Sequence, residues 1–194
     1  MNPFLKIIPI LFLIILGISL SGCVNLDQKT KINSDGSGTM KIKYWTKSSN
    51  VTSDELAGFG FTNRKVRVNY SSKYTEPTNI QIEKDLTSDS LYIVTLDVNF
   101  SDINKITDAI AFDKITTSWD NGNNGMNFKY TLLQDTANAK QLGMIDYKLT
   151  YEFDFPNEVL SSNGDINGRK VLWNFTVADL MEDIELTATI KAGN

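Results

Sequence analysis

Apolar and polar residues alternate along much of the chain after residue 28. The clearest run covers residues 145–155, where Ile145, Tyr147, Leu149 and every second residue after them are apolar and the residues between them are polar or charged. Because successive side chains of a strand point to opposite faces, this period of two predicts a strand with one buried and one wet face. Alternation and β-branched composition predict strands at residues 29–33, 39–45, 66–70, 79–86, 91–100, 114–119, 126–133, 145–155, 170–176 and 184–191.

One segment has helical spacing instead. Ser101 and Asp102 offer an N-cap, and Ile103, Ile106 and Ile110 follow at i, i+3 and i+7, which predicts a short amphipathic helix over residues 102–111. Turns rich in Gly, Asn and Asp at residues 33–38 and 120–125 are typical of hairpins. We therefore expect one α+β domain over residues 29–194, mainly antiparallel sheet of about eight or more strands, with one or two short helices packed on one face.

The first 22 residues have the pattern of a signal peptide. A single charge, Lys6, precedes an apolar run of about 14 residues, which as a helix spans about 21 Å, short of the hydrocarbon core of about 30 Å. The run ends in Leu20-Ser21-Gly22-Cys23, which resembles the lipobox of bacterial lipoproteins. We predict cleavage after residue 22, lipidation of Cys23 with fatty acyl chains such as palmitate, and a short tether over residues 23–28. The alternative is an uncleaved anchor followed by an ordinary thiol.

Composition excludes many kinds of site. The chain has no His and one Cys, which removes His-based triads, zinc sites with His or several Cys ligands, haem ligation by His and an intrachain disulfide. The formal net charge of −4 opposes binding to a phosphate backbone, so we expect no nucleic-acid partner. Residues 33–38 and 120–125 partly fit a calcium loop, but Tyr44 and Thr131 stand where a bidentate Glu is needed, so we expect turns there, no metal and no cofactor.

Catalysis has weak candidates. Glu152 and Asp154 lie on one strand face, about 6.5 Å apart along the strand, a spacing that glycosidase carboxylates use. Carboxylates on the wet face of a strand are usually only solvated. Serine nucleophiles would lack a His base, and no motif of a Ser-Lys enzyme is present. We expect the protein not to be an enzyme, and an envelope hydrolase using Glu152 and Asp154 is kept as a rival hypothesis.

An apolar segment over residues 56–61 is neither a plain strand nor a plain helix. It either inserts into the core or forms an apolar flap beside a pocket or a bilayer. In the second case Phe59 and Phe61 would face Ile106 and Ile110 across a hydrophobic ligand held between the sheet and the predicted helix. The same apolar surface would equally form a dry core.

The sequence predicts different environments for Trp119 and Trp173. Trp119 stands beside a turn and could stack on a sugar, whereas Trp173 is in phase with apolar neighbours and is expected in the core.

Two parts of the sequence resemble the LppM-type lipoprotein domain of bacteria. One runs from Gly22-Cys23-Val24 to the hairpin Ser34-Asp35-Gly36, and the other includes Phe155-Pro156 and Val171-Leu172-Trp173. Together they cover about a third of the mature chain, at its two ends. The resemblance implies an α+β domain, similar to tubular lipid-binding modules, in an envelope lipoprotein that handles lipid or glycolipid rather than a catalyst.

These observations predict a lipid-anchored protein of the cell membrane or outer membrane that faces the periplasm or the exterior and binds a lipid or other hydrophobic ligand. Its partners would be the membrane, through the covalent acyl anchor, and a lipid or glycolipid. The alternative is a non-catalytic structural, adhesion or complex-assembly module at the envelope surface, which predicts a solid core and an exposed patch for a protein partner.

Overall fold

The first two strands form a hairpin around the predicted Asp-Gly turn. The computed structural model describes residues 24–56, 58–85, 90–122, 125–134 and 147–193, and in it β1 (Asn25–Ile32) pairs antiparallel with β2 (Gly38–Lys47). Gly36 has φ 83°, which an L side chain rarely adopts, and Asp35 Oδ1 accepts a hydrogen bond of 3.0 Å from Ser37 N. The hairpin is confirmed, and β1 begins four residues before the predicted start at residue 29.

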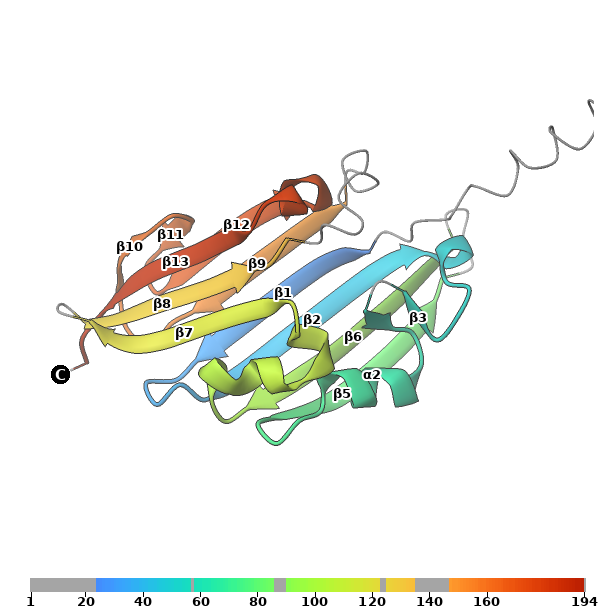
Figure 1. Ribbon diagram of the computed structural model, residues 1–194, viewed down its shortest axis with the longest axis horizontal. Helices are drawn as coiled ribbons and strands as arrows, with labels where there is room; N and C mark the ends of the chain where they lie inside the picture. The colour runs from blue at the N-terminus through green and yellow to red at the C-terminus, as the bar shows by residue number, and fades with distance from the viewer. Residues whose placement is uncertain (1–23, 57, 86–89, 123–124, 135–146, 194) are drawn as a thin grey trace, which may run out of the picture.

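A seven-stranded sheet grows from both sides of this hairpin (Figure 1). Its order is β11-β12-β9-β1-β2-β6-β5, and all neighbours are antiparallel except β1 and β9, which are parallel. The added strands are β5 (Thr75–Lys84), β6 (Leu91–Phe100), β9 (Lys148–Asp154), β11 (Asp165–Asn167) and β12 (Lys170–Thr176). The parallel pair joins the start of the domain to its last third.

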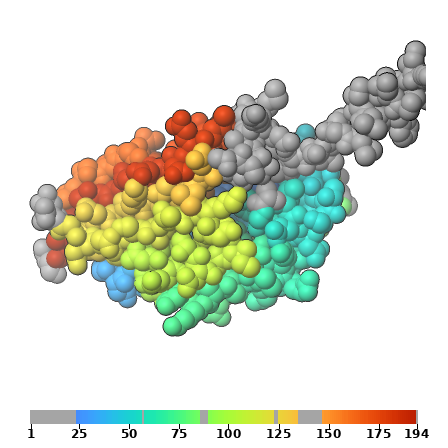
Figure 2. All heavy atoms as spheres, viewed as in Figure 1, coloured from blue at the N-terminus to red at the C-terminus, as the bar shows by residue number. Residues whose placement is uncertain are grey.

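A second layer covers one face of this large sheet. A small sheet of order β10-β13-β8-β7 lies over one half, and short helices lie over β6 and β5 (Figure 1). In space-filling view the two parts form one continuous layer (Figure 2). The elements are β7 (Ile115–Gly122), β8 (Gly125–Leu132), β10 (Val159–Ser162), β13 (Ile184–Lys191), the pair β3 (Glu55–Leu56) and β4 (Phe59–Gly60), α2 (Asn63–Tyr70), and 3-10 turns η3 (Ser48–Asn50), η4 (Ile103–Asp108), η5 (Ile110–Phe112) and η6 (Val177–Met181). The predicted fold class, mainly antiparallel β with short helices on one face, is confirmed.

The strand predicted at residues 66–70 is wrong, because this segment belongs to helix α2. Thr62 caps the helix by accepting a hydrogen bond of 3.3 Å from Lys65 N. Val66 and Tyr70 are four residues apart and buried, whereas Val68 between them is 52% exposed. Val66, Val68 and Tyr70 fit alternation as well as a helical face, and the cap at Thr62 was the signal that separates the two.

The helix predicted over residues 102–111 is instead a pair of 3-10 turns, η4 and η5. The predicted cap is present, since Asp102 accepts a hydrogen bond of 2.9 Å from Asn104 N. A 3-10 helix repeats every three residues, so the side chains that point inward are Ile103, Ile106, Ala109 and Phe112. Ile110 breaks this period and is 53% exposed.

Aromatic rings join the two layers. Phe128 of β8 lies 4.7 Å from Phe153 of β9, measured between ring centroids, and Trp119 of β7 stacks on Phe155 with an interplanar angle of 7°. Trp173 meets Phe153 edge-on and is buried, as its phase predicted. Such pairs contribute about 0.5–1.5 kcal/mol each beyond the area that they bury. The two sheets therefore close on each other over a continuous core.

This core contains ionisable tyrosines, and we expect it to weaken at high pH. Burial raises the pKa of Tyr44, Tyr70, Tyr130 and Tyr151 above the ordinary value of 10.0. The folded chain therefore holds these protons more tightly than the unfolded chain, so their contribution to stability is full below pH 10 and falls as the pH rises beyond it. Urea titrations at about pH 8 and at about pH 11 measure how far the free energy of unfolding falls between the two. This fall should be about 1.4 kcal/mol smaller for Tyr151→Phe than for the unchanged protein. Equal losses would contradict the assignment.

Candidate functional site

The apolar segment over residues 56–61 lies against the core. Phe61 is 2% exposed, and its ring meets the ring of Tyr44 edge-on at 5.6 Å. Phe59 is half-buried, with its ring 4.9 Å from Tyr44. The Tyr44 hydroxyl donates a hydrogen bond to the Gly60 carbonyl, and Asn69 Nδ2 donates one of 2.9 Å to the Gly58 carbonyl. Of the two interpretations of this segment, the structure favours insertion into the core.

The structure places the four residues predicted to hold a hydrophobic ligand in different environments. Phe61 and Ile106 are both core side chains, and Ile110 points away from the core. Phe59 belongs to the short pair β3–β4 that packs on Tyr44. Cys23, the predicted lipidation site, lies outside the described residues. The structure therefore brings two of the four into the core and leaves the other two at its margin.

Other sequence candidates are also placed. Trp119 is 6% exposed, so the sugar-stacking interpretation of this residue is wrong. Glu152 forms an ion pair with Lys170 at 2.8 Å, and Asp154 pairs with Arg169 at 3.3 Å. The hydrogen bond from Lys170 to Glu152 raises the pKa of the lysine. Each carboxylate is thus engaged by a cation of the same sheet.

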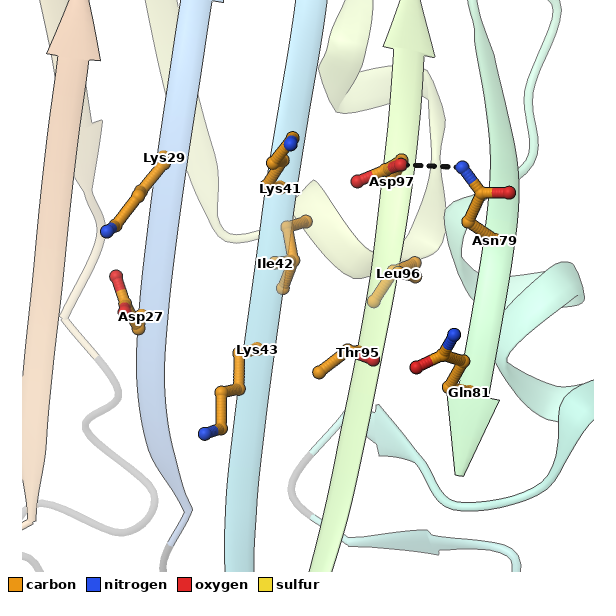
Figure 3. A pocket seen from close by; sticks show the side chains of 10 residues that line it. All are labelled: Asp27, Lys29, Lys41, Ile42, Lys43, Asn79, Gln81, Thr95, Leu96 and Asp97. Carbon is orange, nitrogen blue, oxygen red and sulfur yellow. Dashed lines mark hydrogen bonds between the residues drawn. The ribbon is translucent and has the colours of Figure 1, made fainter. Parts of the chain in front are cut away.

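A surface hollow of about 320 Å³ lies on the face of the large sheet that the second layer leaves open (Figure 3). Figure 3 looks onto this face, with the helices behind the strands. Four strands line it, with Asp27 and Lys29 from β1, Lys41, Ile42 and Lys43 from β2, Thr95, Leu96 and Asp97 from β6, and Asn79 and Gln81 from β5. We call this feature the lysine hollow.

Strand register places like charges side by side in the lysine hollow. Lys29 and Lys41 are direct cross-strand partners, and Lys43 follows Lys41 on the same face. Like charges directly opposite each other destabilise a sheet by a few tenths of a kcal/mol up to about 1 kcal/mol. Among the described residues, neither Lys29 nor Lys41 forms an ion pair. The fold therefore keeps two ammonium groups available on neighbouring strands.

A bulge aims an amide at the same place. The register of β5 against β6 shifts between Thr78 and Gln81, and Asn79 within the shift has φ 51°. Asn is among the few side chains that adopt this left-handed conformation readily. Asn79 Nδ2 donates a hydrogen bond of 2.7 Å to Asp97 Oδ2, as the dashed line in Figure 3 shows. This bond orients the Asp97 carboxylate, which stands opposite Lys41 on the neighbouring strand.

The arrangement suits an anion. Three ammonium groups face two carboxylates around the lysine hollow, and one of those carboxylates, Asp97, already accepts the Asn79 amide. Lysine is a point-charge binder of phosphate, and amide donors can supply further hydrogen bonds. One carboxylate oxygen, Asp27 Oδ1, is buried without a hydrogen-bond partner, so an occupant with a hydroxyl or amine donor could also be bound there. Such a set of donors can bind a polar, negatively charged group.

A second hollow, of about 590 Å³, lies at the turn between α2 and β5. Its lining contains one cation, Lys73, and one carboxylate, Glu76. The Lys73 ammonium lies 5.3 Å from the ring centroid of its neighbour Tyr74. Because its charges are balanced and its cation is already placed over a ring, this hollow is the weaker candidate.

The sequence patterns above do not predict the lysine hollow, although the lysines that form it are regularly spaced in the sequence. Lys41 and Lys43 alternate with inward residues, and so do Lys29 and Lys31 on the other arm of the same hairpin. Residues 25–47 hold five lysines and two aspartates in a chain with a net charge of −4. Pairing the two arms around Asp35-Gly36 would have placed the lysines on one face.

A comparison with solved structures found chains that are similar to this one. Neither a protein-family model nor a curated protein matches the chain. The folded domain of LppM from Mycobacterium tuberculosis, solved by NMR, is similar to it with a TM-score of 0.48 and 15% identity, over 88% of this chain and 91% of that one. Within the described residues, no helix is long and apolar enough to cross a membrane, and no group of three or more Cys, Asp or Glu side chains is placed to hold a metal ion.

The placement of the apolar residues gives a direct test. We expect Phe61→Ala to lower the free energy of unfolding by about 3–5 kcal/mol, because it leaves a cavity in a packed core. The matched change Ile110→Ala removes an exposed side chain and should alter it by no more than about 0.5 kcal/mol. Urea titration of the two variants measures both values. Similar small effects would mean that Phe61 is not a core residue and would restore the apolar ligand site to consideration.

Proposed function

We propose that this chain is a lipoprotein of a bacterial cell envelope, held in a membrane by acyl chains on Cys23, and that its domain binds the anionic head group of a lipid or glycolipid in the lysine hollow. The anchor places the protein on the cell membrane or outer membrane, facing the periplasm or the exterior. The proposal is of a binding protein rather than an enzyme. The observation that carries it is the directly opposed pair Lys29 and Lys41, neither of which forms an ion pair within the described residues, on the open face of a domain that begins right after a lipobox-like sequence.

The position of the first strand supports the anchor. Val24 is buried, and β1 begins at Asn25, so the packed domain starts immediately after Cys23. The predicted tether over residues 23–28 is mostly strand. A signal peptide that ends at residue 22 would be removed without touching the described fold, and lipidated Cys23 would become the first residue of a domain seated against the membrane.

The charges of the lysine hollow support a phosphate-bearing ligand. Lys29, Lys41 and Lys43 come from two adjacent strands, so their spacing is fixed by the sheet rather than by a loop. Each lysine near an anionic membrane surface is worth about 1 kcal/mol of attraction. A lipid head group and free inorganic phosphate share the chemistry that these lysines recognise, and a membrane anchor makes the lipid the more abundant source.

A ligand in the interior fits the structure less well. To lie between the large sheet and the helices, acyl chains would have to displace Phe61 or Ile106, both of which are in the core. The surface hollow needs no such rearrangement. We therefore propose that the lipid is recognised through its head group, on the outer face of the large sheet rather than on the inner face.

The anchor can be tested by metabolic labelling. In a bacterial host, the unchanged chain should incorporate a labelled fatty acid and lose residues 1–22, whereas Cys23→Ser should do neither, because a serine oxygen cannot replace the thioether of the lipid linkage. Mass spectrometry of the purified proteins checks the cleavage and the acyl mass. Labelled lipid that persists on Cys23→Ser would disprove the assignment of this residue.

Head-group recognition can be tested with residues 24–194, which contain the whole described fold. We expect them to bind vesicles containing phosphatidylglycerol and not vesicles of phosphatidylcholine alone. Lys29→Thr with Lys41→Thr should weaken binding by about 30-fold, from about 1 kcal/mol per lysine. Lys129→Thr with Lys191→Thr is the control, because it removes the same charge from exposed strand positions of the small sheet.

Inorganic phosphate added in competition separates the two sources of the ligand. Displacement from the vesicles by millimolar phosphate would identify the phosphate group itself as the ligand, and resistance would identify the lipid. Equal binding of the unchanged protein, the double variant and the control would contradict the lysine hollow. Absence of vesicle binding by all three would favour the anchored structural module, and the search would then turn to protein partners.

A further inference from the structure

The open face of the large sheet also carries apolar side chains, and they gather at one end. Trp45 of β2 is half-buried, and its direct neighbour on β6 is Ile93. Leu91, two residues earlier on the same face, is likewise half-buried. Within the described residues none of the three belongs to the set that packs against the core cluster, although half-buried Ile82 and Tyr92 beside them do. We call Trp45, Leu91 and Ile93 the anchor-side patch.

Strand register fixes this patch close to Cys23. Trp45 is the direct cross-strand partner of Asn25, so their Cα atoms are about 5 Å apart. From Asn25 back to Cys23 the chain can span at most about 7 Å. Wherever the membrane holds Cys23, the Trp45 backbone lies within about 12 Å of it.

Charged side chains of both signs surround the patch. The Lys43 ammonium lies 5.4 Å from the centre of the Trp45 ring, Lys47 is the cross-strand partner of Leu91, and both lysines are exposed. Lys148 is exposed beside Asn25, whose Oδ1 accepts a hydrogen bond of 3.0 Å from the Lys148 backbone. Three carboxylates are also near: Glu83 is the partner of Ile93 on β5, Asp85 is hydrogen-bonded through its backbone N–H to the Leu91 carbonyl, and Asp27 is the partner of Lys43 on β1. Tryptophan flanked by lysines is typical of residues that sit at a membrane–water interface.

We infer that the anchor-side patch inserts into the head-group region of the bilayer that holds Cys23, and so fixes the orientation of the domain. This inference rests on the proposed lipidation of Cys23. The occupant is the lipid surface itself, because the membrane is the one partner that the lipid linkage brings within reach of Trp45. Lys43 lines the lysine hollow and its ammonium lies against the Trp45 ring of the patch, so the hollow would open next to the head groups.

Tryptophan fluorescence of the acylated protein can test whether Trp45 contacts the bilayer. Trp119 and Trp173 are 6% and 4% exposed, so Trp45 is the tryptophan that a membrane-borne quencher can reach. The mature lipoprotein is reconstituted in vesicles of phosphatidylcholine and phosphatidylglycerol, with or without brominated acyl chains. We expect a loss of emission with bromine that is absent from Trp45→Phe, a change that keeps the patch apolar and removes its fluorophore.

The outcomes separate this inference from the function on which it rests. A protein shown by mass to be acylated on Cys23, but equally fluorescent in both kinds of vesicle, would overturn the patch and leave the anchor intact. A protein without acyl chains would overturn both. A loss of emission that survives in Trp45→Phe would assign the quenching to a buried tryptophan and would also overturn the inference. Asn99→Trp in the Trp45→Phe background, at the far end of the open face, is the matched control and should be quenched less than Trp45.

Discussion

The parallel pairing of β1 with β9 is the constraint on which the rest of this structure depends. β1 lies between its own hairpin partner and a strand more than a hundred residues away, so it occupies the middle of the large sheet. Its inward side chains meet the second layer, and its outward ones, Asp27 and Lys29, line the lysine hollow. Because the strand begins at Asn25, the same element links a predicted membrane anchor to both the core and the open face.

The two faces of the large sheet differ in what covers them and in the charge that they carry. The inner face is closed by rings such as Phe128 against Phe153, which leave side chains packed rather than a cavity to fill. The outer face carries lysines whose mutual repulsion costs stability. An opposed pair such as Lys29 and Lys41 does not stabilise the folded state by itself. A bound anion would offset the repulsion between the two lysines, since a ligand that binds the folded state stabilises that state.

Sequence patterns predicted the strands well where burial of one face alone decides the structure. The run at residues 91–100 is β6 to the residue, and the run at residues 170–176 is β12. They failed where a short segment satisfies two periods at once, as Val66, Val68 and Tyr70 do in α2, and where a 3-10 turn imposes a period of three on Ile103 and Ile106. The lysine hollow was beyond a reading of single strands, because it depends on the register between β1 and β2 and on the bulge at Asn79.

The long separation between β1 and β9 also sets the order in which contacts can form during synthesis. The first strand can form its hairpin early, but its other edge stays unpaired until residue 154 has emerged, and contacts so distant along the chain form late. An open edge of this kind is prone to pair with other chains. The proposed attachment of Cys23 to a membrane would hold each unfinished chain at the surface, apart from others, until the rest of the domain is complete.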